Sequence, residues 1–199
     1  VLLFSYAVDF GDTHCIDLAQ GESIPQEIIN ALKDKNVIKH AYNAPFEITC
    51  LNRAGYETPA NQWHCTMFHG LYLGYPAGLA LIGEALGLDK DKLKDPTGKA
   101  LIRFFSIPCK PTKSNGGRTR NLPHHDPGKW ELYKKYNIQD VVTEMEIYKR
   151  LVLIPVPDRE QALWVLEQDY HRYGIPVDME LIQGAIAIRE RRNAELLEE

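Results

Sequence analysis

The pattern of apolar and polar residues is clearest in residues 130–151, WELYKKYNIQDVVTEMEIYKRL, where apolar side chains recur every three or four positions. This spacing predicts one amphipathic helix. At about 100° per residue, Tyr136 and Asp140 project together from one side of that helix, because they lie four positions apart. The core stripe expected on the opposite side consists of Ile138, Val141, Val142, Met145, Tyr148 and Val152.

Taken alone, the pair Tyr136 and Asp140 has two interpretations. A tyrosine and an acid at this spacing occur often by accident, in which case Asp140 is a solvated acid and Tyr136 a surface aromatic. The alternative is that both belong to a functional site on this face of the helix. The neighbouring segments have to decide between the two.

Strand and helix patterns alternate at the start of the chain. Residues 1–8 and 13–19 are apolar runs on either side of the turn sequence DFGD, a pattern typical of a β-hairpin. Residues 23–32 then predict a short helix.

A strand-to-helix junction follows. VIKHAY at residues 37–42 predicts a strand, and EITCLNRAG at residues 47–55 predicts the helix into which it runs, with Asn43 able to cap that helix. Such a unit, with other strands and helices on both sides, indicates an α/β sheet fold. Ligands of these folds gather at the carboxyl ends of strands, which is where Asn43, Phe46 and Glu47 fall.

The remaining segments are mostly helical. Pro155 and Pro157 interrupt the chain after the central helix. Further helices are predicted at residues 77–88, 97–106, 158–173 and 178–199, and a short strand or helix at residues 63–73.

Residues 109–127, CKPTKSNGGRTRNLPHHDP, show no periodicity and predict a long loop. The loop carries Lys110, Lys113, Arg118 and Arg120, with no acid before Asp126. Two interpretations carry equal weight: a solvated flexible loop, or a segment that contacts phosphates.

Composition narrows the class of protein. The 199 residues are 44% hydrophobic and 25% charged, which is ordinary for a globular chain, and the net charge of -4 gives no overall signal of nucleic-acid binding. Four widely spaced cysteines fit reduced thiols in a cytoplasmic protein. No apolar run approaches the roughly 20 residues that span a bilayer, so no membrane partner is expected.

The N-x-x-F-E junction (Asn43, Phe46, Glu47) and the later Y-x-x-x-D helix (Tyr136, Asp140) resemble, in order and setting, the second and third motifs of the DEDD-type 3′-5′ exonucleases of the tyrosine subclass. The runs KHAYNAPFEITCL, CKPTKSNGGRTRNLP, KWELYKKYNIQDV and RYGIPVDMELI resemble the family A DNA polymerases of bacteriophages and prophages. This second resemblance spans almost the whole chain. It implies a ribonuclease H-like exonuclease fold, a mixed sheet with flanking helices.

The resemblance also implies a chemistry, hydrolysis of 3′-terminal phosphodiesters with two divalent cations, Mg²⁺ or Mn²⁺, about 4 Å apart. Asp140 would bind one ion, Glu47 the second, directly or through water, and Tyr136 would orient the attacking water. The expected partners are the single-stranded 3′ end of DNA, a primer-template, and deoxynucleotides for a polymerase domain. The expected DNA-contacting residues are Asn43, Phe46, Lys110, Lys113, Arg118 and Arg120.

The chain departs from the family pattern in two respects. The first exonuclease motif, D-x-E on the opening strand, is not present, and Glu47 stands where the wider superfamily has aspartate. We therefore expect residues 1–155 to form an exonuclease-like domain without its first strand, and to bind metal weakly and be inactive in isolation. Residues 156–199 are expected to connect to an absent polymerase domain, in a bacterial cytoplasm.

Two alternative functions remain at this point. The first is a non-catalytic exonuclease-like module that holds single-stranded DNA or positions the polymerase. The second is a free-standing exonuclease that trims RNA.

Overall fold

The computed structural model of the chain describes residues 1–89 and 98–198. It divides into two compact units, Val1–Ala162 and Leu163–Glu199. The described helices lie at α1 (Gln26–Lys33), α2 (Ala44–Arg53), α3 (Thr66–Tyr72), α4 (Leu79–Ala85), α5 (Gly98–Ser106), α6 (Pro127–Leu151), α7 (Asp158–Tyr173) and α8 (Met179–Glu198), with 3-10 turns at Leu18–Gln20, Ala60–Gln62 and Pro123–His125. Of the helix predicted over residues 97–106, Thr97 lies outside the described residues.

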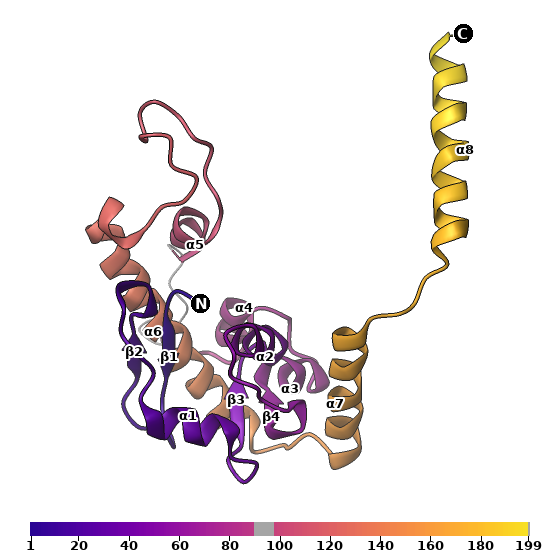
Figure 1. The fold of residues 1–199 in the computed structure, drawn as a ribbon. Helices are drawn as coiled ribbons and strands as arrows, with labels where there is room; N and C mark the ends of the chain where they lie inside the picture. Colours follow the sequence, from indigo (N-terminus) through magenta and orange to yellow (C-terminus); the bar gives the residue numbers. More distant parts are fainter. Residues whose placement is uncertain (90–97, 199) are drawn as a thin grey trace. The chain divides into compact units, whose positions relative to one another are not determined.

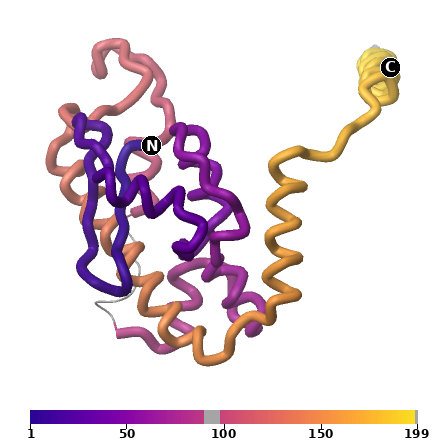
Figure 2. Tube along the Cα trace, turned by 60° about the horizontal axis from the view of Figure 1, so that its bottom comes forward, coloured from indigo at the N-terminus to yellow at the C-terminus, as the bar shows by residue number. Residues whose placement is uncertain are grey.

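Helix α6 is the element around which the first unit is built. It contacts α3, α4 and α5 and both strands of the first hairpin, and Figures 1 and 2 show it running alongside that hairpin. Asp126 caps its start, where the carboxylate accepts a hydrogen bond from the Lys129 backbone N at 3.0 Å, and Pro127 occupies its first turn. The predicted central helix is thus confirmed, with a start three residues earlier than expected.

The predicted hairpin is also confirmed. Strands β1 (Phe4–Tyr6) and β2 (His14–Ile16) pair antiparallel. The turn between them places Asp9 and Phe10 at positive φ, and Gly11 N donates to Val8 O at 2.8 Å. Phe10 is held in this unusual conformation for a bulky side chain, and its ring stacks on Tyr148 of α6 at a centroid distance of 5.9 Å.

A second strand pair, β3 (Lys39–Ala41) and β4 (Trp63–Cys65), is parallel. The mixed α/β class is confirmed, but the expected single mixed sheet is wrong for the described residues, which form two separate two-stranded sheets. Strand pairing depends on contacts far apart in sequence, which local periodicity does not report. The segment predicted as a short strand or helix turns out to be β4 followed directly by α3.

The predicted core stripe of α6 is wrong. None of its six residues is buried, and Val152 is 42% exposed. The buried residues of α6 are Trp130, Tyr136, Thr143, Glu144, Ile147 and Leu151. Counting apolar residues missed this face because it includes polar side chains whose hydrogen bonds are satisfied, such as Thr143 Oγ1, which donates to Gln139 O at 2.8 Å.

Two apolar clusters hold α6 in place. One packs Ile147 and Leu151 against Ile82 and its neighbours from α4, and the other joins Phe105 of α5 to Trp130. The Trp130 indole Nε1 donates to the buried Asp17 Oδ2 at 2.7 Å, which satisfies both buried groups. Asp17 therefore has a structural role.

After α6, Gln161 in the first turn of α7 still belongs to the first unit, since its Nε2 donates to Trp63 O at 3.0 Å. A domain boundary near residue 155 stays a prediction. None of the described helices combines the length and the apolar composition that crossing a bilayer requires.

Gly98 at the start of α5 offers a test of this packing. A Cβ atom at Gly98 would overlap the buried ring of Tyr136, so the substitution Gly98→Ala should lower the free energy of unfolding by about 1–3 kcal/mol. Urea denaturation measures this difference. Gly128→Ala, in the first turn of α6, is the matched control because its Cβ would meet only an ordinary contact at 3.7 Å. Equal stability of the two variants would contradict the packing of α5 on Tyr136.

Candidate active site

The strand-to-helix junction presents its side chains at the carboxyl end of β3. Ala44 is fully buried and Pro45 lies in the first turn of α2, so the junction is closely packed. Asn43 occupies the N-cap position, but its side chain makes no capping hydrogen bond. Its backbone O instead accepts from Phe46 N at 2.8 Å. Asn43 thus stands at the predicted N-cap position but does not cap with its side chain, and its exposed amide is left for other contacts.

Three carboxylates come together where α6 passes this junction. Glu47 is in the first turn of α2, and Asp140 and Glu144 are one helical turn apart on α6. The pKa of Glu47 is raised to about 7, first of all by burial, which outweighs a backbone hydrogen bond to its carboxylate. The negative charges of Glu144 and Asp140 raise it further, so these acids are close enough to repel one another.

Glu144 is the residue that sequence reasoning missed. It is 8% exposed, and burial raises its pKa although Thr66 Oγ1 donates to its Oε1 at 2.5 Å. Thr66 follows β4 directly at the start of α3, so this hydrogen bond ties α6 to the carboxyl end of the second parallel strand. The available signal was the spacing of Glu144, four positions after Asp140, which puts both acids on one face of the helix.

The donor chemistry of this cluster suits a hard divalent cation. Carboxylate oxygens are the ligands that Mg²⁺ prefers. Glu47 Oε2 is buried and has no hydrogen-bond partner among the described residues, which is costly for a carboxylate oxygen unless a cation is present. As these side chains stand, no group of three His, Cys, Asp or Glu in residues 1–89 and 98–198 has an arrangement ready to hold an ion. Asp140 and Glu47 thus fit a cation by chemistry, and a bound ion would have to draw them closer.

Tyr136 lies on the same face of α6 as Asp140, yet it does not project away from the core as expected. It is 3% exposed, its ring stacks on Tyr133 at a centroid distance of 6.2 Å, and Gly98 of α5 lies against it. The sequence interpretation failed here because it could not include α5 as a cover for this face.

The predicted DNA-contacting residues fall into two places. Phe46, at the junction, is 61% exposed and can meet a ligand. Lys110, Lys113 and Arg120 are exposed on the loop that follows α5, whereas Arg118 is half-buried and its Nε donates to Asn121 Oδ1 at 2.9 Å.

Comparison with known proteins adds one relative. Over 201 residues, the full chain is 47% identical to a protein named DNA polymerase from Bacillus phage SP02. The chain spans about a third (31%) of the length of that relative. No protein-family model and no solved structure matches the chain.

The raised pKa of Glu47 predicts that the stability of the folded chain depends on pH. Because the folded chain holds this proton up to a pH of about 7, against an ordinary value of 4.5, the folded state binds more protons than the unfolded state between these values. This contribution to stability is present below pH 4.5 and is lost as the pH rises through 7. At about 1.4 kcal/mol per pKa unit, the loss is at most about 3 kcal/mol.

Urea unfolding at pH 5, 6, 7 and 8 without divalent cations tests this dependence. Glu47→Gln should flatten the fall in stability relative to the wild-type chain. The control variant is Glu27→Gln, which alters an exposed acid in the first turn of α1. If Glu47→Gln and wild type show parallel curves, Glu47 does not titrate in this range.

Proposed function

We propose that the chain is the 3′-5′ exonuclease-like part of a DNA polymerase, with a ribonuclease H-like fold. The intact polymerase would remove terminal nucleotides by two-cation hydrolysis, whereas this chain in isolation would be inactive because it lacks the D-x-E motif of the opening strand. The observation that carries this proposal is the approach of Glu47 to Asp140 across 93 positions of sequence, at the carboxyl end of β3. The similarity to part of a phage DNA polymerase supports the same assignment. Because the chain spans 31% of that relative, polymerisation itself is assigned to other parts of the polypeptide.

In this proposal Asp140 and Glu47 hold the divalent cations, Mg²⁺ or Mn²⁺. The cations supply charge neutralisation at the attacking and leaving oxygens of an in-line displacement. A proton must leave Glu47 for it to bind a cation, since its pKa is raised to about 7. Cation binding should therefore release protons near neutral pH.

The other residues position the substrate. Phe46, exposed at the start of α2, offers an aromatic face on which a terminal base can stack. Asn43 beside it presents an amide that can donate to and accept from the nucleotide. Tyr136 enters from the resemblance alone, as the group that orients water. It lies one helical turn before Asp140, but α5 covers its ring in this structure.

A second candidate is a module that binds single-stranded DNA without cutting it. The raised pKa of Glu47 favours this alternative, because a protonated carboxyl near pH 7 holds a cation poorly. The two candidates differ in what Asp140 does. It is essential in the first and dispensable in the second.

Replacement of Asp140 by asparagine decides between them. In the polymerase that carries this chain, Asp140→Asn should slow removal of a mismatched 3′ nucleotide by roughly 100-fold or more, since the variant loses a carboxylate that neutralises the reacting phosphate. Primer extension should stay unchanged. Asp12→Asn, an exposed acid in the hairpin turn, is the control and should cleave normally. Normal mismatch removal by Asp140→Asn would overturn the catalytic assignment.

A further inference from the structure

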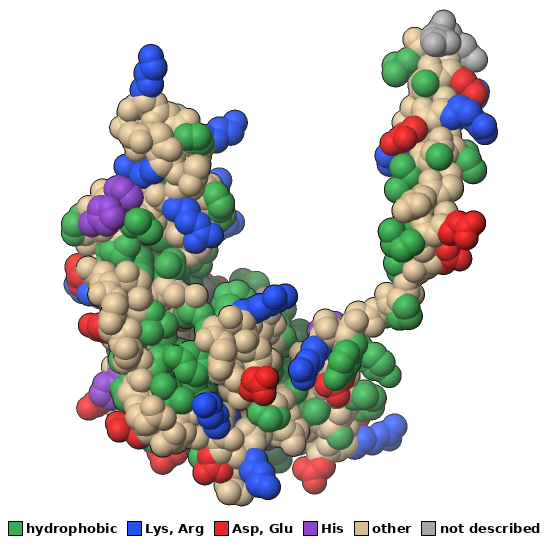
Figure 3. Space-filling model, viewed as in Figure 1, with side chains coloured by type: hydrophobic (Ala, Val, Ile, Leu, Met, Phe, Trp, Pro, Cys, Tyr) green, Lys and Arg blue, Asp and Glu red, His purple; other side chains and the backbone are tan. Residues whose placement is uncertain are grey.

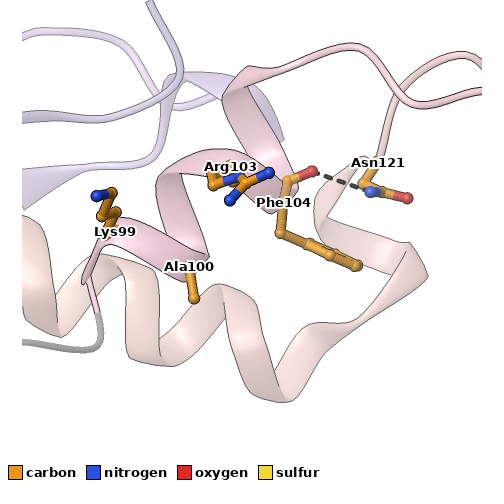
Figure 4. Close-up of a pocket in the computed structure, with 5 residues that line it drawn as sticks. All are labelled: Lys99, Ala100, Arg103, Phe104 and Asn121. Atoms are coloured by element: carbon orange, nitrogen blue, oxygen red, sulfur yellow. Dashed lines mark hydrogen bonds between the residues drawn. The ribbon is translucent and has the colours of Figure 1, made fainter.

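A hollow of about 580 Å³ lies between α5 and the loop that follows it. Lys99, Ala100, Arg103, Phe104 and Asn121 line it. Figure 4 shows Lys99 and Arg103 along the same helix, with Asn121 reaching the carbonyl of Phe104 from the loop. None of these five residues belongs to the carboxylate site or to the loop cations predicted from the sequence.

The charge of this region is one-sided. Residues 98–125 hold six of the 23 Lys and Arg of the chain and none of its 27 Asp and Glu. The rest of the chain is strongly acidic, with 17 cations left against all 27 acids. Figure 3 shows Lys and Arg side chains gathered over α5 and the loop, at the upper left of that view. A net charge of -4 for the whole chain therefore conceals a local basic surface.

These cations lack the ion pairs found elsewhere in the chain. Other lysines have acidic partners, for example Lys129 with Asp126 at 2.6 Å and Lys149 with Glu146 at 2.8 Å. In the part of the chain that the structure describes, no acid pairs with any of the six cations in residues 98–125. Their positive charges are therefore available to a polyanion.

The hollow has fixed walls. The Arg118 Nε donates a hydrogen bond to Asn121 Oδ1, and the Asn121 Nδ2 donates to the backbone O of Phe104 at 2.9 Å. These hydrogen bonds anchor the loop to α5. Helix α5 is itself anchored to α6, because Phe105 packs edge-on against Trp130 at a centroid distance of 4.8 Å. A ligand entering the hollow would meet a surface that is already ordered, which lowers the entropic cost of binding.

Lys99 and Arg103 are suited to phosphates. They lie four positions apart on the exposed side of α5, about 6 Å along the helix axis at 1.5 Å per residue. Arg103 can bind a phosphate with two parallel hydrogen bonds, and Lys99 acts as a point charge. Phe104 adds a half-buried aromatic ring beside them, which can contact an unpaired base or a sugar.

We infer that α5 and its following loop bind a single strand of nucleic acid, with Lys99 and Arg103 contacting its phosphates inside the hollow. The choice of nucleic acid as the polyanion rests on the proposed function. The surface itself is separate from the carboxylates, so it would deliver or retain the strand and not take part in hydrolysis.

The test is the salt dependence of binding to an oligo-dT strand, measured by fluorescence anisotropy with the full chain. Each phosphate contact on a single strand contributes about 0.7 to the slope of log affinity against log salt. The double variant Lys99→Ala with Arg103→Ala should bind more weakly, with a slope smaller by about 1.4. Lys33→Ala with Lys35→Ala removes two exposed cations near α1 and should leave the slope unchanged.

Two further arms make the result decisive. The charge-preserving double variant Lys99→Arg with Arg103→Lys should restore the wild-type slope, whereas a merely structural role would not be rescued by charge. Tighter binding to a duplex of equal length would contradict the single-strand assignment. Three results would overturn the inference. They are an unchanged slope in the double alanine variant, a slope reduced equally in the Lys33/Lys35 control, and no binding by the wild-type chain.

Failure of this inference can be told apart from failure of the proposed function. The salt dependence of strand binding is measured without divalent cations and without cleavage, so it tests Lys99 and Arg103 independently of the carboxylates, none of which lines the hollow. Normal binding without cleavage by the polymerase would remove the exonuclease assignment and leave the basic surface in place. Normal cleavage by the polymerase, together with an unaltered slope in the double alanine variant, would keep the exonuclease assignment and remove the basic surface as a binding site.

Discussion

Repulsion among partly buried carboxylates is the physical constraint that shapes the candidate site. Glu47 reaches the carboxyl end of β3 from α2, while Asp140 and Glu144 approach from α6. Burial and mutual proximity make such a cluster costly, and the chain offsets part of that cost by holding protons and by the hydrogen bond from Thr66 to Glu144. Under the proposed function, divalent cations bound at Glu47 and Asp140 would offset more of this cost.

The start and the middle of α6 lie beside surfaces of opposite charge. Near Pro127, α5 and its loop carry six cations and no acid, whereas the middle of the helix carries the acids that face Glu47. A nucleic-acid strand would be attracted by the first surface and repelled by the second unless cations are bound. Under the two proposals, this division would separate holding a strand from acting on it, and α6 would connect the two surfaces.

The sequence predicted those features that depend on neighbouring residues. The hairpin turn at Asp9 and Phe10, the strand-to-helix junction at Asn43 and the extent of α6 all follow from local patterns, as does the irregular loop after α5. The buried face of α6 could not be predicted from local patterns, because Thr143 and Glu144 are polar residues that hydrogen bonds allow to be buried. Glu144 in particular depends on Thr66, 78 positions away, and Tyr136 is covered by a helix whose docking no local pattern reports. The parallel pairing of β3 with β4 is non-local as well, since it joins residues 39–41 to residues 63–65.

The central claim, that Glu47 and Asp140 together form a site for divalent cations, can be measured directly. Carbon-13 NMR of the side-chain carboxyls during titration with Mn²⁺ reports which acids lie beside the ion, because the paramagnetic ion broadens only nearby signals. The account predicts that the Glu47 and Asp140 signals broaden first and together, at low Mn²⁺, with exposed acids such as Asp12 unaffected. Broadening spread evenly over exposed acids, with Glu47 and Asp140 unchanged, would contradict it.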